Sequence, residues 1–323
     1  MADGVSDRKK RAGQSDDAVL PFATVRSRVG GRLVRLGATV DTILTRHDYP
    51  APVAQALGEA LALTALLGKM LKTGSKLILQ TKTDGALRLL VVNYEAPGRM
   101  RGYASHDAAR LAALATGRPI TQGAVLGHGH LAMTIDPGGD KPSYQGIVAL
   151  SGQTLAEAAH AYFRQSEQLP TFIRVAVARH YTAGEGGAPG GWGWRAGVLM
   201  VQHTASERGR PGREGESLQP SDDEDDHWRR VRLLATTVED HELLDPMLAP
   251  ERLLYRLFHE EGVRVGAATP LVARCRCSRA RVEMLLKSFD AVELDDMREP
   301  DGGFTVTCEF CNAQYRFAAR EFE

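Results

Sequence analysis

The stretches "LVARCRCSRARVEML" (residues 271–285) and "TCEFCNAQ" (307–314) carry all four cysteines of the 323-residue chain. One residue separates the first pair of thiols, two separate the second, and 30 residues lie between the pairs. This spacing supplies the four sulfurs of a tetrahedral zinc site, and an iron-sulfur cluster is the alternative that the same thiols leave open. We therefore expect one zinc ion per chain, bound by Cys275, Cys277, Cys308 and Cys311.

A metal would also explain how this end of the chain folds. A segment of about 55 residues is too small to be held together comfortably by hydrophobic burial, so metal binding would supply much of its folding free energy. Four arginines surround the first pair of thiols, and nearby cations favour the thiolate, which both metals and oxidants prefer. The alternative is that these arginines only cover the exposed face of a helix from Ser278 to Lys287. They are Arg274, Arg276, Arg279 and Arg281.

The composition is typical of a globular protein, with 43% hydrophobic residues and a net charge of zero. A neutral chain lacks the excess of Lys and Arg that attracts nucleic acid or anionic membranes. Residues 1–19 contain basic residues without a following apolar segment, which favours a disordered tail over a signal peptide. The most apolar stretch, residues 57–71, is interrupted by Glu59 and Lys69 and is too short to span a membrane. We expect a cytoplasmic protein, where clustered cysteines are more often metal-binding or redox-active than structural disulfides.

Residues 20–205 alternate between strand-like and helix-like patterns. Two-residue turn signals at Gly30–Gly31 and at Asp84–Gly85 each lie between two alternating runs, and "GHLAMTIDPGGDKPSYQGIVAL" (129–150) repeats the pattern with a longer loop. Residues 52–71 begin with Pro52 and are apolar on more than one face, as in a buried helix. Thr154 and Glu157 form a capping box for a helix that should end by Pro170. These patterns predict an α+β core domain.

The composition changes after residue 205. Residues 206–227 are rich in Gly, Pro and charged residues. Such a segment cannot bury enough apolar surface to offset the entropy lost on ordering, so we expect a loop. This loop would include the acidic run Asp222–Asp226. Residues 228–262 then show short amphipathic helical patterns interrupted by prolines. We expect a polar loop and helical linker over 206–265 and a zinc-binding redox-switch domain over 266–323. The linker would rest on the zinc domain and cover an apolar face of the core.

Other candidate sites are weaker. His128 and His130 alternate beside glycines and are more typical of surface residues than of metal ligands. "HELLD" (241–245) starts like a zinc-protease motif but has Asp245 where the second histidine would stand. The sequence contains neither a phosphate-binding loop ending in Gly-Lys-Ser/Thr nor a Gly-x-Ser-x-Gly elbow, so ATP-driven or hydrolytic chemistry has no support and we expect no enzyme.

The motif "CRCSRAR" (275–281) followed by "CEFC" (308–311) resembles the redox switch of the 33 kDa chaperonin family, the redox-regulated holdases of bacteria. The resemblance continues through "HDYPAPV" (47–53) and "YFRQSEQLPTFIR" (162–174) and covers the chain from about residue 20. It implies a substrate-binding core, a helical linker and a carboxy-terminal zinc domain with the four cysteines as ligands. It also implies ATP-independent binding of unfolding proteins after oxidation has formed disulfides and released the metal. The polar tail and the longer loop at 206–227 depart from the family.

Two other functions use the same thiols. A zinc-ribbon regulator would bind nucleic acid, but residues 266–323 hold eight Lys or Arg and ten Asp or Glu, a net charge of 8 − 10 = −2. A thiol-disulfide oxidoreductase would need a strand-helix-strand unit around Cys308 and Cys311, which the pattern does not show. For a holdase, the partners are unfolding client proteins, with a homodimer in the activated state. Because short loops close fastest, we expect the disulfides Cys275–Cys277 and Cys308–Cys311.

Overall fold

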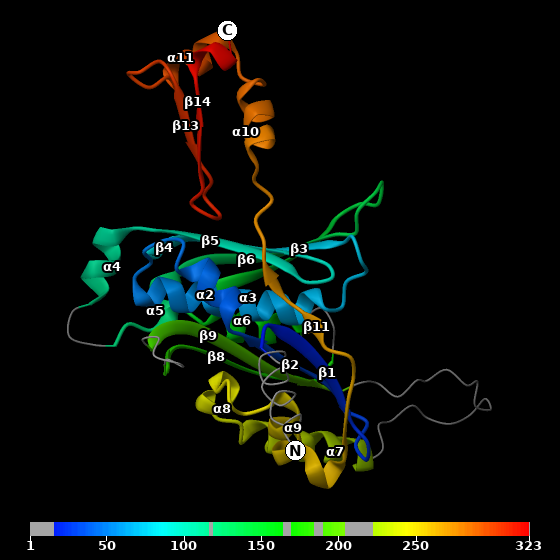
Figure 1. Ribbon diagram of the computed structural model, residues 1–323. Helices are drawn as coiled ribbons and strands as arrows, with labels where there is room; N and C mark the ends of the chain where they lie inside the picture. Colours follow the sequence, from blue (N-terminus) through cyan, green and yellow to red (C-terminus); the bar gives the residue numbers. More distant parts are fainter. Residues whose placement is uncertain (1–15, 116–118, 164–168, 184–189, 204–221, 323) are drawn as a thin grey trace, which may run out of the picture.

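The computed structural model describes residues 16–115, 119–163, 169–183, 190–203 and 222–322. Its core is built in four layers, in which two sheets enclose one layer of helices and a second layer of helices covers the outer face of one sheet (Figure 1). A slender carboxy-terminal module stands on the outer side of the other sheet (Figure 1). The α+β class expected from the sequence is confirmed.

The first sheet lies next to the carboxy-terminal module and has the order β12-β5-β4-β3-β6-β7. Asp84 and Gly85 lie in the turn between β3 and β4, and the longer loop joins β6 to β7, as the turn signals predict. Its strands are β3 (Lys76–Thr83), β4 (Leu87–Glu95), β5 (Arg99–His106), β6 (His128–Asp136), β7 (Tyr144–Ser151) and β12 (Val272–Ala273).

The second sheet has the order β10-β1-β2-β9-β8, with β11 also paired to β1. The hairpin predicted at Gly30–Gly31 exists, but its turn precedes Gly30, and both glycines lie inside β2. A Cβ on Gly31 would lie 2.2 Å from the Phe22 ring, so the glycine there makes room for an aromatic side chain rather than for a turn. The strands are β1 (Ala18–Thr24), β2 (Gly30–Leu36), β8 (Thr171–Thr182), β9 (Gly191–Gln202), β10 (Val263–Val265) and β11 (Thr269–Pro270). The last two residues of the expected tail, 18 and 19, thus already belong to β1, and residues 1–15 lie outside the described part.

Helix α3 (Ala51–Gly68) fills the space between the two sheets and is buried on nearly all faces. It has the length and composition of a membrane span, but 72% of that window is buried inside the protein, which identifies it as a core helix. Pro52 lies in its first turn, as predicted. The capping box of Thr154 and Glu157 is present at the start of α6. The predicted end of this helix, before Pro170, falls partly on residues 164–168, which are outside the described part of the chain. The other core helices are α2 (Ala38–Leu44), α4 (Ala108–Leu114), α5 (Gln122–Leu126) and α6 (Leu155–Tyr162).

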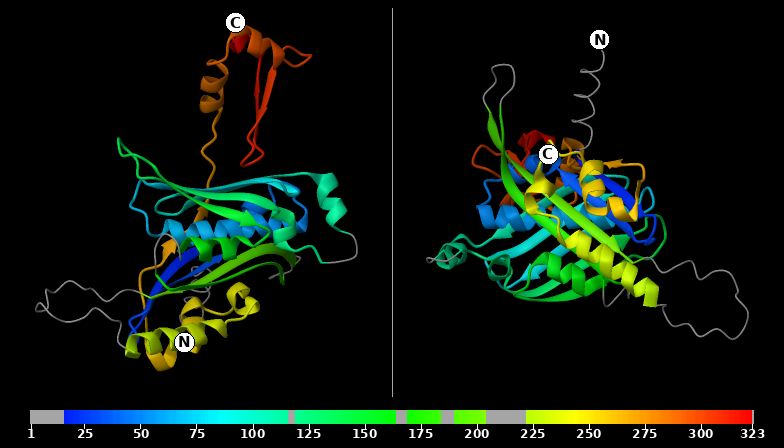
Figure 2. Two further views of the ribbon diagram at one scale, coloured as in Figure 1. Left: turned by 180° about the vertical axis from the view of Figure 1, so that it is seen from behind. Right: turned by 90° about the horizontal axis from the view of Figure 1, so that it is seen from below.

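The linker helices α7 (Asp222–Thr236), α8 (Asp240–Leu244) and α9 (Pro250–Phe258) pack on the outer face of the second sheet (Figures 1 and 2). Helix α7 already begins at Asp222, so the acidic run 222–226 is helical rather than a loop. Once the packing of Val231 and Ala235 has fixed the helix, each residue added at its amino terminus gains a backbone hydrogen bond at little cost, which the expectation of a loop overlooked. The polar stretch 204–221 lies outside the described residues. The linker therefore covers an apolar face of the core, as expected.

The linker does not rest on the cysteine module, contrary to the expectation. Figures 1 and 2 show the helices and the module at opposite ends of the molecule. Residues 262–274, which we call the strap, run between them along the edges of both sheets: β10 and β11 pair with β1, and β12 pairs in parallel with β5. Residues 269–273, expected within the zinc domain, thus extend the sheets of the core. The strap is therefore the stretch of backbone that directly joins the cysteines to the linker helices.

The carboxy-terminal module contains helix α10 (Arg279–Leu286), helix α11 (Ala291–Asp296), the hairpin of β13 (Phe304–Thr307) and β14 (Gln314–Phe317), and the short 3-10 helix η3 (Ala319–Glu321); a further 3-10 turn, η2 (His259–Glu261), ends the linker. Ser278 caps α10, so the predicted helix from Ser278 to Lys287 is confirmed. The buried apolar cluster of the module consists of Val282, Leu286, Phe304 and Phe317. So small a core agrees with a module that needs a further stabilising element.

Candidate metal and redox centre

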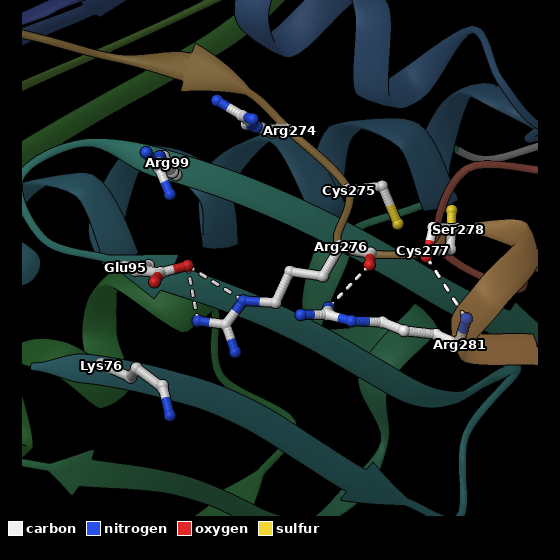
Figure 3. Close-up of a pocket in the computed structure, with 9 residues that line it drawn as sticks. All are labelled: Lys76, Glu95, Arg99, Arg274, Cys275, Arg276, Cys277, Ser278 and Arg281. Atoms are coloured by element: carbon white, nitrogen blue, oxygen red, sulfur yellow. Dashed lines mark hydrogen bonds and ion pairs between the residues drawn. The ribbon is translucent and has the colours of Figure 1, made fainter. Parts of the chain in front are cut away.

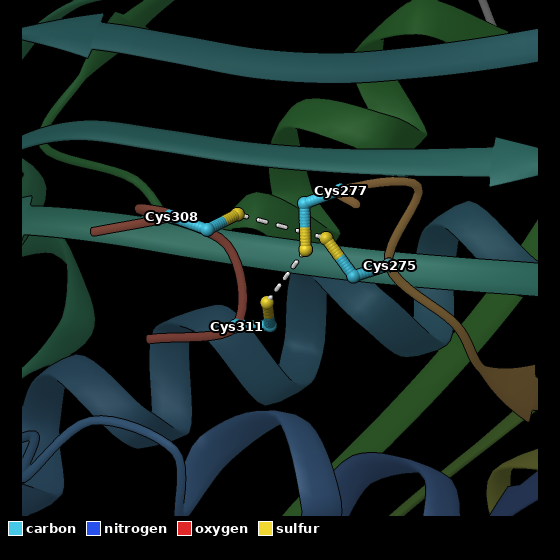
Figure 4. A group of neighbouring side chains, drawn as sticks. All are labelled: Cys275, Cys277, Cys308 and Cys311. Carbon is cyan, nitrogen blue, oxygen red and sulfur yellow. Dashed lines mark hydrogen bonds between the residues drawn. The ribbon is translucent and has the colours of Figure 1, made fainter. Parts of the chain in front are cut away.

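The four cysteines converge where the strap enters the module. Cys275 and Cys277 lie on the extended segment after β12, and Cys308 and Cys311 lie in the turn of the β13–β14 hairpin (Figure 4). In that turn the backbone N–H groups of Cys311 and Asn312 both donate to the Cys308 carbonyl. Asn312 has φ +57°, a left-handed conformation that asparagine tolerates. The sequence "CEFCN" thus forms a tight turn that directs both thiols to one side.

The thiols are close enough to share one ion. The four sulfur atoms lie within 4.8 Å of one another, and the nearest contacts are Cys275 Sγ to Cys308 Sγ at 3.7 Å and Cys277 Sγ to Cys311 Sγ at 3.2 Å. Sulfurs at about 2.3 Å around a tetrahedral ion are roughly 3.8 Å apart. All four cysteines are free thiols and half-buried. The donor set therefore fits a tetrahedral thiolate-bound metal.

The thiols titrate as one interacting group. Burial opposes ionisation of Cys275, but hydrogen bonds from the Cys277 backbone and from the other thiols outweigh it and lower its pKa. Burial raises the pKa values of Cys308 and Cys311. The hydroxyl of Tyr315 donates to Cys277 Sγ over 3.2 Å, and this bond raises the tyrosine pKa to about 12. Hydrogen bonds within the cluster therefore favour the thiolate form that a metal binds.

Three of the four surrounding arginines bind groups other than the sulfurs. Arg276 forms an ion pair with Glu95 of β4, with 2.9 Å between Arg276 Nε and Glu95 Oε2. Arg281 donates a hydrogen bond to the Arg276 carbonyl. Arg279 pairs with Glu321 and lies over the Phe317 ring at 4.2 Å. The lowered pKa of Cys275 thus arises from hydrogen bonds rather than from these cations. Two arginines hold the module together, and Arg276 ties it to the core.

The turn of the module also contacts the core directly, and sequence reasoning missed this contact. The Arg101 guanidinium lies 3.9 Å from the centroid of the Phe310 ring, and the Tyr103 ring lies 6.4 Å from it. Asn312 Nδ2 donates to the Arg46 carbonyl over 3.1 Å. Burial lowers the pKa of His47, and the nearby backbone of Glu309 and Phe310 partly offsets this effect. The sequence did contain one signal of this contact. Phe310 stands between two thiols in a module that offers an aromatic ring few apolar neighbours, which indicates a packing partner elsewhere in the chain.

The remaining candidates are not brought together. His128 and His130 are exposed at the start of β6, and the His128 ring lies 3.9 Å from an Asp84 carboxylate oxygen. Within the part of the chain that the structure describes, the four cysteines are the one group of thiol, imidazole or carboxylate ligands clustered to hold a metal ion. Residues 241–245 form α8 and its end rather than a metalloprotease helix.

Comparison with known proteins agrees with this architecture. Residues 17–318 match the family model described as "Hsp33 protein". The chain is 43% identical over 314 residues to the 33 kDa chaperonin of Caulobacter vibrioides (strain NA1000 / CB15N), covering 97% of this chain and 98% of that protein. It is 35% identical over 305 residues to the 33 kDa chaperonin of Nitrosococcus oceani, covering 94% and 91% of the two chains.

A solved structure supports the fold alone. The crystal structure of the 33 kDa chaperonin from Thermotoga maritima superposes with a TM-score of 0.70 at 21% identity, covering 95% of this chain and 96% of that one. Together with the family model and the curated relatives, these observations show that the chain belongs to the Hsp33 family of chaperones.

Proposed function

We propose that the protein is an ATP-independent holdase, regulated by oxidation, that binds unfolding client proteins and prevents their aggregation in the bacterial cytoplasm. One arrangement carries the proposal: the four-thiol centre and the linker helices lie at opposite ends of the core and are joined by the strap. Melting the module would release one end of the strap. This is a binding function, and it requires no catalytic residue.

In the reduced state, the thiolates of Cys275, Cys277, Cys308 and Cys311 would hold one zinc ion. The ion supplies folding free energy to a module whose apolar core is small. Oxidation by a peroxide turns two thiolates into one disulfide; the two electrons lost and two protons convert the peroxide to two waters or to water and an alcohol. A disulfide sulfur is no longer an anionic donor, so the module loses its metal and unfolds.

The strap would transmit this unfolding. Its backbone N–H groups at Val272 and Arg274 donate to the carbonyls of Gly98 and Met100, and the N–H of Leu271 donates to Asp17. These bonds hold a segment that is extended and largely exposed apart from Leu271. Once the module no longer restrains residue 274, the strap can separate from β5 and β1 in turn.

The surface that would open is the apolar contact between the linker helices and the second sheet. Phe22 of β1 stacks on Phe258 of α9 with ring centroids 5.5 Å apart. The contact is also held by Arg35, a side chain only 1% exposed that donates to the carbonyls of Glu242, Asp245 and Leu248. Exposed apolar surface of this kind captures the exposed apolar surface of other proteins. The apolar residues buried in it include Leu20, Leu33, Leu199, Val201, Val231, Leu253 and Leu257.

A light-scattering assay on an unfolding client tests the proposal. The zinc-loaded, reduced protein should suppress aggregation poorly, and peroxide with mild heat should activate it without ATP; a homodimer is expected in the active form. The variant Cys311→Ser should lose zinc and be active without oxidant, whereas Ser288→Cys, which adds a thiol outside the centre, should behave as the wild type. Equal suppression by the reduced and oxidised proteins, or a requirement for ATP, would contradict the function.

A further inference from the structure

A cavity of about 550 Å³ lies between the cysteine-bearing segment and the core (Figure 3). Its walls come from two parts of the chain: β3, β4 and β5 on one side, and residues 274–281 on the other. The cavity is lined by Lys76, Glu95, Arg99, Arg274, Cys275, Arg276, Cys277, Ser278 and Arg281. Five of these nine side chains are cationic and one is a carboxylate, so the lining apart from its thiols carries 5 − 1 = +4 charges. Four thiolates around a zinc ion would offset about two of these.

Part of this charge is already neutralised. Arg276 is paired with Glu95, and Lys76 lies 3.2 Å from Asp136 in the adjoining hollow. Among the described residues, Arg99, Arg274 and Arg281 form no ion pair with a carboxylate, and Arg281 instead donates to a backbone carbonyl. Like charges gathered in one cavity repel each other, and an anion that binds between them removes this repulsion.

The register of the strap brings two of these arginines, Arg99 and Arg274, to the same part of the sheet. Strand β12 pairs in parallel with β5, so that Val272 faces Arg99, and the Arg274 N–H continues the ladder to Met100. Arg99 and Arg274 line the same two hollows, and they are neighbours in the view of Figure 3. One arginine belongs to the core and the other to the strap. A ligand held by both would bridge the two parts of the chain.

We propose that this cavity binds an inorganic phosphate chain, such as tripolyphosphate, and that the bound chain holds the strap against the core. Guanidinium groups bind phosphate oxygens in bidentate fashion, and the volume is several times that of a single tetrahedral oxyanion. The nine lining residues include no aromatic ring, so a nucleoside base could stack only on guanidinium groups that the phosphates also need. The structure therefore favours the free phosphate chain over a nucleotide.

Binding at this site would oppose activation. The cavity exists only while residues 274–281 lie on the core, so the anion binds the closed form and not the released one. At a free concentration ten times Kd, the linkage relation shifts the equilibrium about elevenfold toward the closed form. This regulatory consequence rests on the proposed function, whereas the binding itself does not.

Calorimetric titration of the full-length, reduced, zinc-loaded protein with sodium tripolyphosphate tests the site. We expect saturable binding of one chain per protein, weakened at least tenfold in Arg99→Gln/Arg274→Gln and unchanged in Lys82→Gln, which removes one charge from the same sheet outside the cavity. Zinc content is measured after each titration, because tripolyphosphate can also chelate zinc. If the heat is accompanied by loss of zinc from the protein, it reports chelation rather than binding in the cavity, and the proposal is overturned. Binding that persists in the double variant would also overturn it.

Two further measurements test the class of ligand and the effect of binding on the strap. ATP should bind no tighter than tripolyphosphate; tighter binding would refute the choice of the free chain. Hydrogen exchange in residues 263–281 should slow about tenfold at ten times Kd in the wild type and not in the double variant. Exchange that stays unchanged at saturation would overturn the bridging role. None of these measurements requires holdase activity, so failure of the site and failure of the holdase function remain distinguishable.

Discussion

Arg101 of β5 lies over the ring of Phe310, with 3.9 Å between the guanidinium carbon and the ring centroid, and thereby joins the core to the turn between two of the thiols. The contact brings the metal-binding turn onto the first sheet, where Asn312 adds a hydrogen bond to the Arg46 carbonyl. Arg276 and Glu95 make a second connection on the strap side. The cysteine centre is therefore attached to the core at two points.

The first prediction concerns this attachment. Phe310→Ala removes the cation–π contact, which is worth about 0.5–1 kcal/mol at a partly exposed site, so detachment of the module should become roughly two- to fivefold more favourable. Zinc loss under peroxide, followed with a chromophoric zinc indicator, should accelerate by the same factor. Tyr144→Ala, which truncates an exposed aromatic residue on β7, should leave the rate unchanged. A wild-type rate in Phe310→Ala would show that the contact does not restrain the module.

The second prediction concerns the strap. A Cβ on Gly98 would lie 2.0 Å from the Pro270 carbonyl oxygen, so Gly98→Ala forces the strap away from β5. Such a clash with backbone costs about 1–3 kcal/mol. We expect faster hydrogen exchange in residues 263–274 and a higher basal suppression of aggregation in the reduced protein. Gly191→Ala is the matched control, because a Cβ there meets nothing within 4 Å. If exchange in the strap rises without any gain in activity, the strap does not transmit the signal.

These contacts show where sequence reasoning ended. Periodicity and turn chemistry were enough to find α3, the β3–β4 hairpin and the capping box of α6, because each depends on neighbouring residues. The spacing of the thiols was likewise enough to find the four-cysteine centre, because each pair of thiols is close together in the chain. The course of the strap, the position of Gly31 inside a strand and the contact of Phe310 with Arg101 depend on residues far apart in the chain. No local pattern encodes such pairs, so the linker was expected beside the cysteines although it lies at the opposite end.

A third prediction tests the buried arginine beneath the linker. Arg35→Met leaves three linker carbonyls without their donor and should weaken docking of α8 and α9 by about 3 kcal/mol. We expect an apolar fluorescent dye to bind the reduced variant, with faster exchange in 240–258 and unchanged protection in α3. Arg88→Met, which breaks an exposed ion pair with Asp107, serves as the control. Dye binding equal to that of the wild type would mean that Arg35 does not hold the linker.

A fourth prediction concerns pH. Burial raises the pKa of Glu59, although Gln122 and the Ala156 N–H donate to its carboxylate. An acid with a raised pKa in the folded state binds its proton more tightly there, so its contribution to stability is complete below the unfolded pKa and is lost as pH rises through the folded pKa. The amide of Glu59→Gln does not titrate and can accept only one of these two hydrogen bonds, so the variant should gain stability relative to the wild type as the pH rises from acid to neutral. Urea denaturation of both proteins across this range measures it, with the exposed Asp140→Asn as the control. A constant difference at every pH would exclude the carboxylate as its cause.

The last prediction concerns the disulfides of the oxidised protein. In the folded module the nearest sulfurs belong to different pairs, Cys277 with Cys311 and Cys275 with Cys308. If oxidation were completed inside the folded module, those crossed bridges would form. If the module loses its metal and unfolds before the first bond closes, loop length decides instead, and the short loops Cys275–Cys277 and Cys308–Cys311 close fastest. We expect the local pairs, because a module with so small an apolar core should not remain folded once oxidation of a first thiolate to a sulfenic acid has released the metal.

Peptide mapping by mass spectrometry under non-reducing conditions distinguishes the two patterns, and sampling during a slow peroxide addition shows their order. A bridge over one intervening residue is strained, so Cys275–Cys277 should be reduced at a lower dithiothreitol concentration than Cys308–Cys311. The variant Phe310→Ala provides a further check, since a module that detaches sooner should form an even larger share of local bridges. Predominant Cys277–Cys311 and Cys275–Cys308 bridges would mean that the thiols are oxidised while the module is still folded, and unfolding would then follow oxidation instead of directing it.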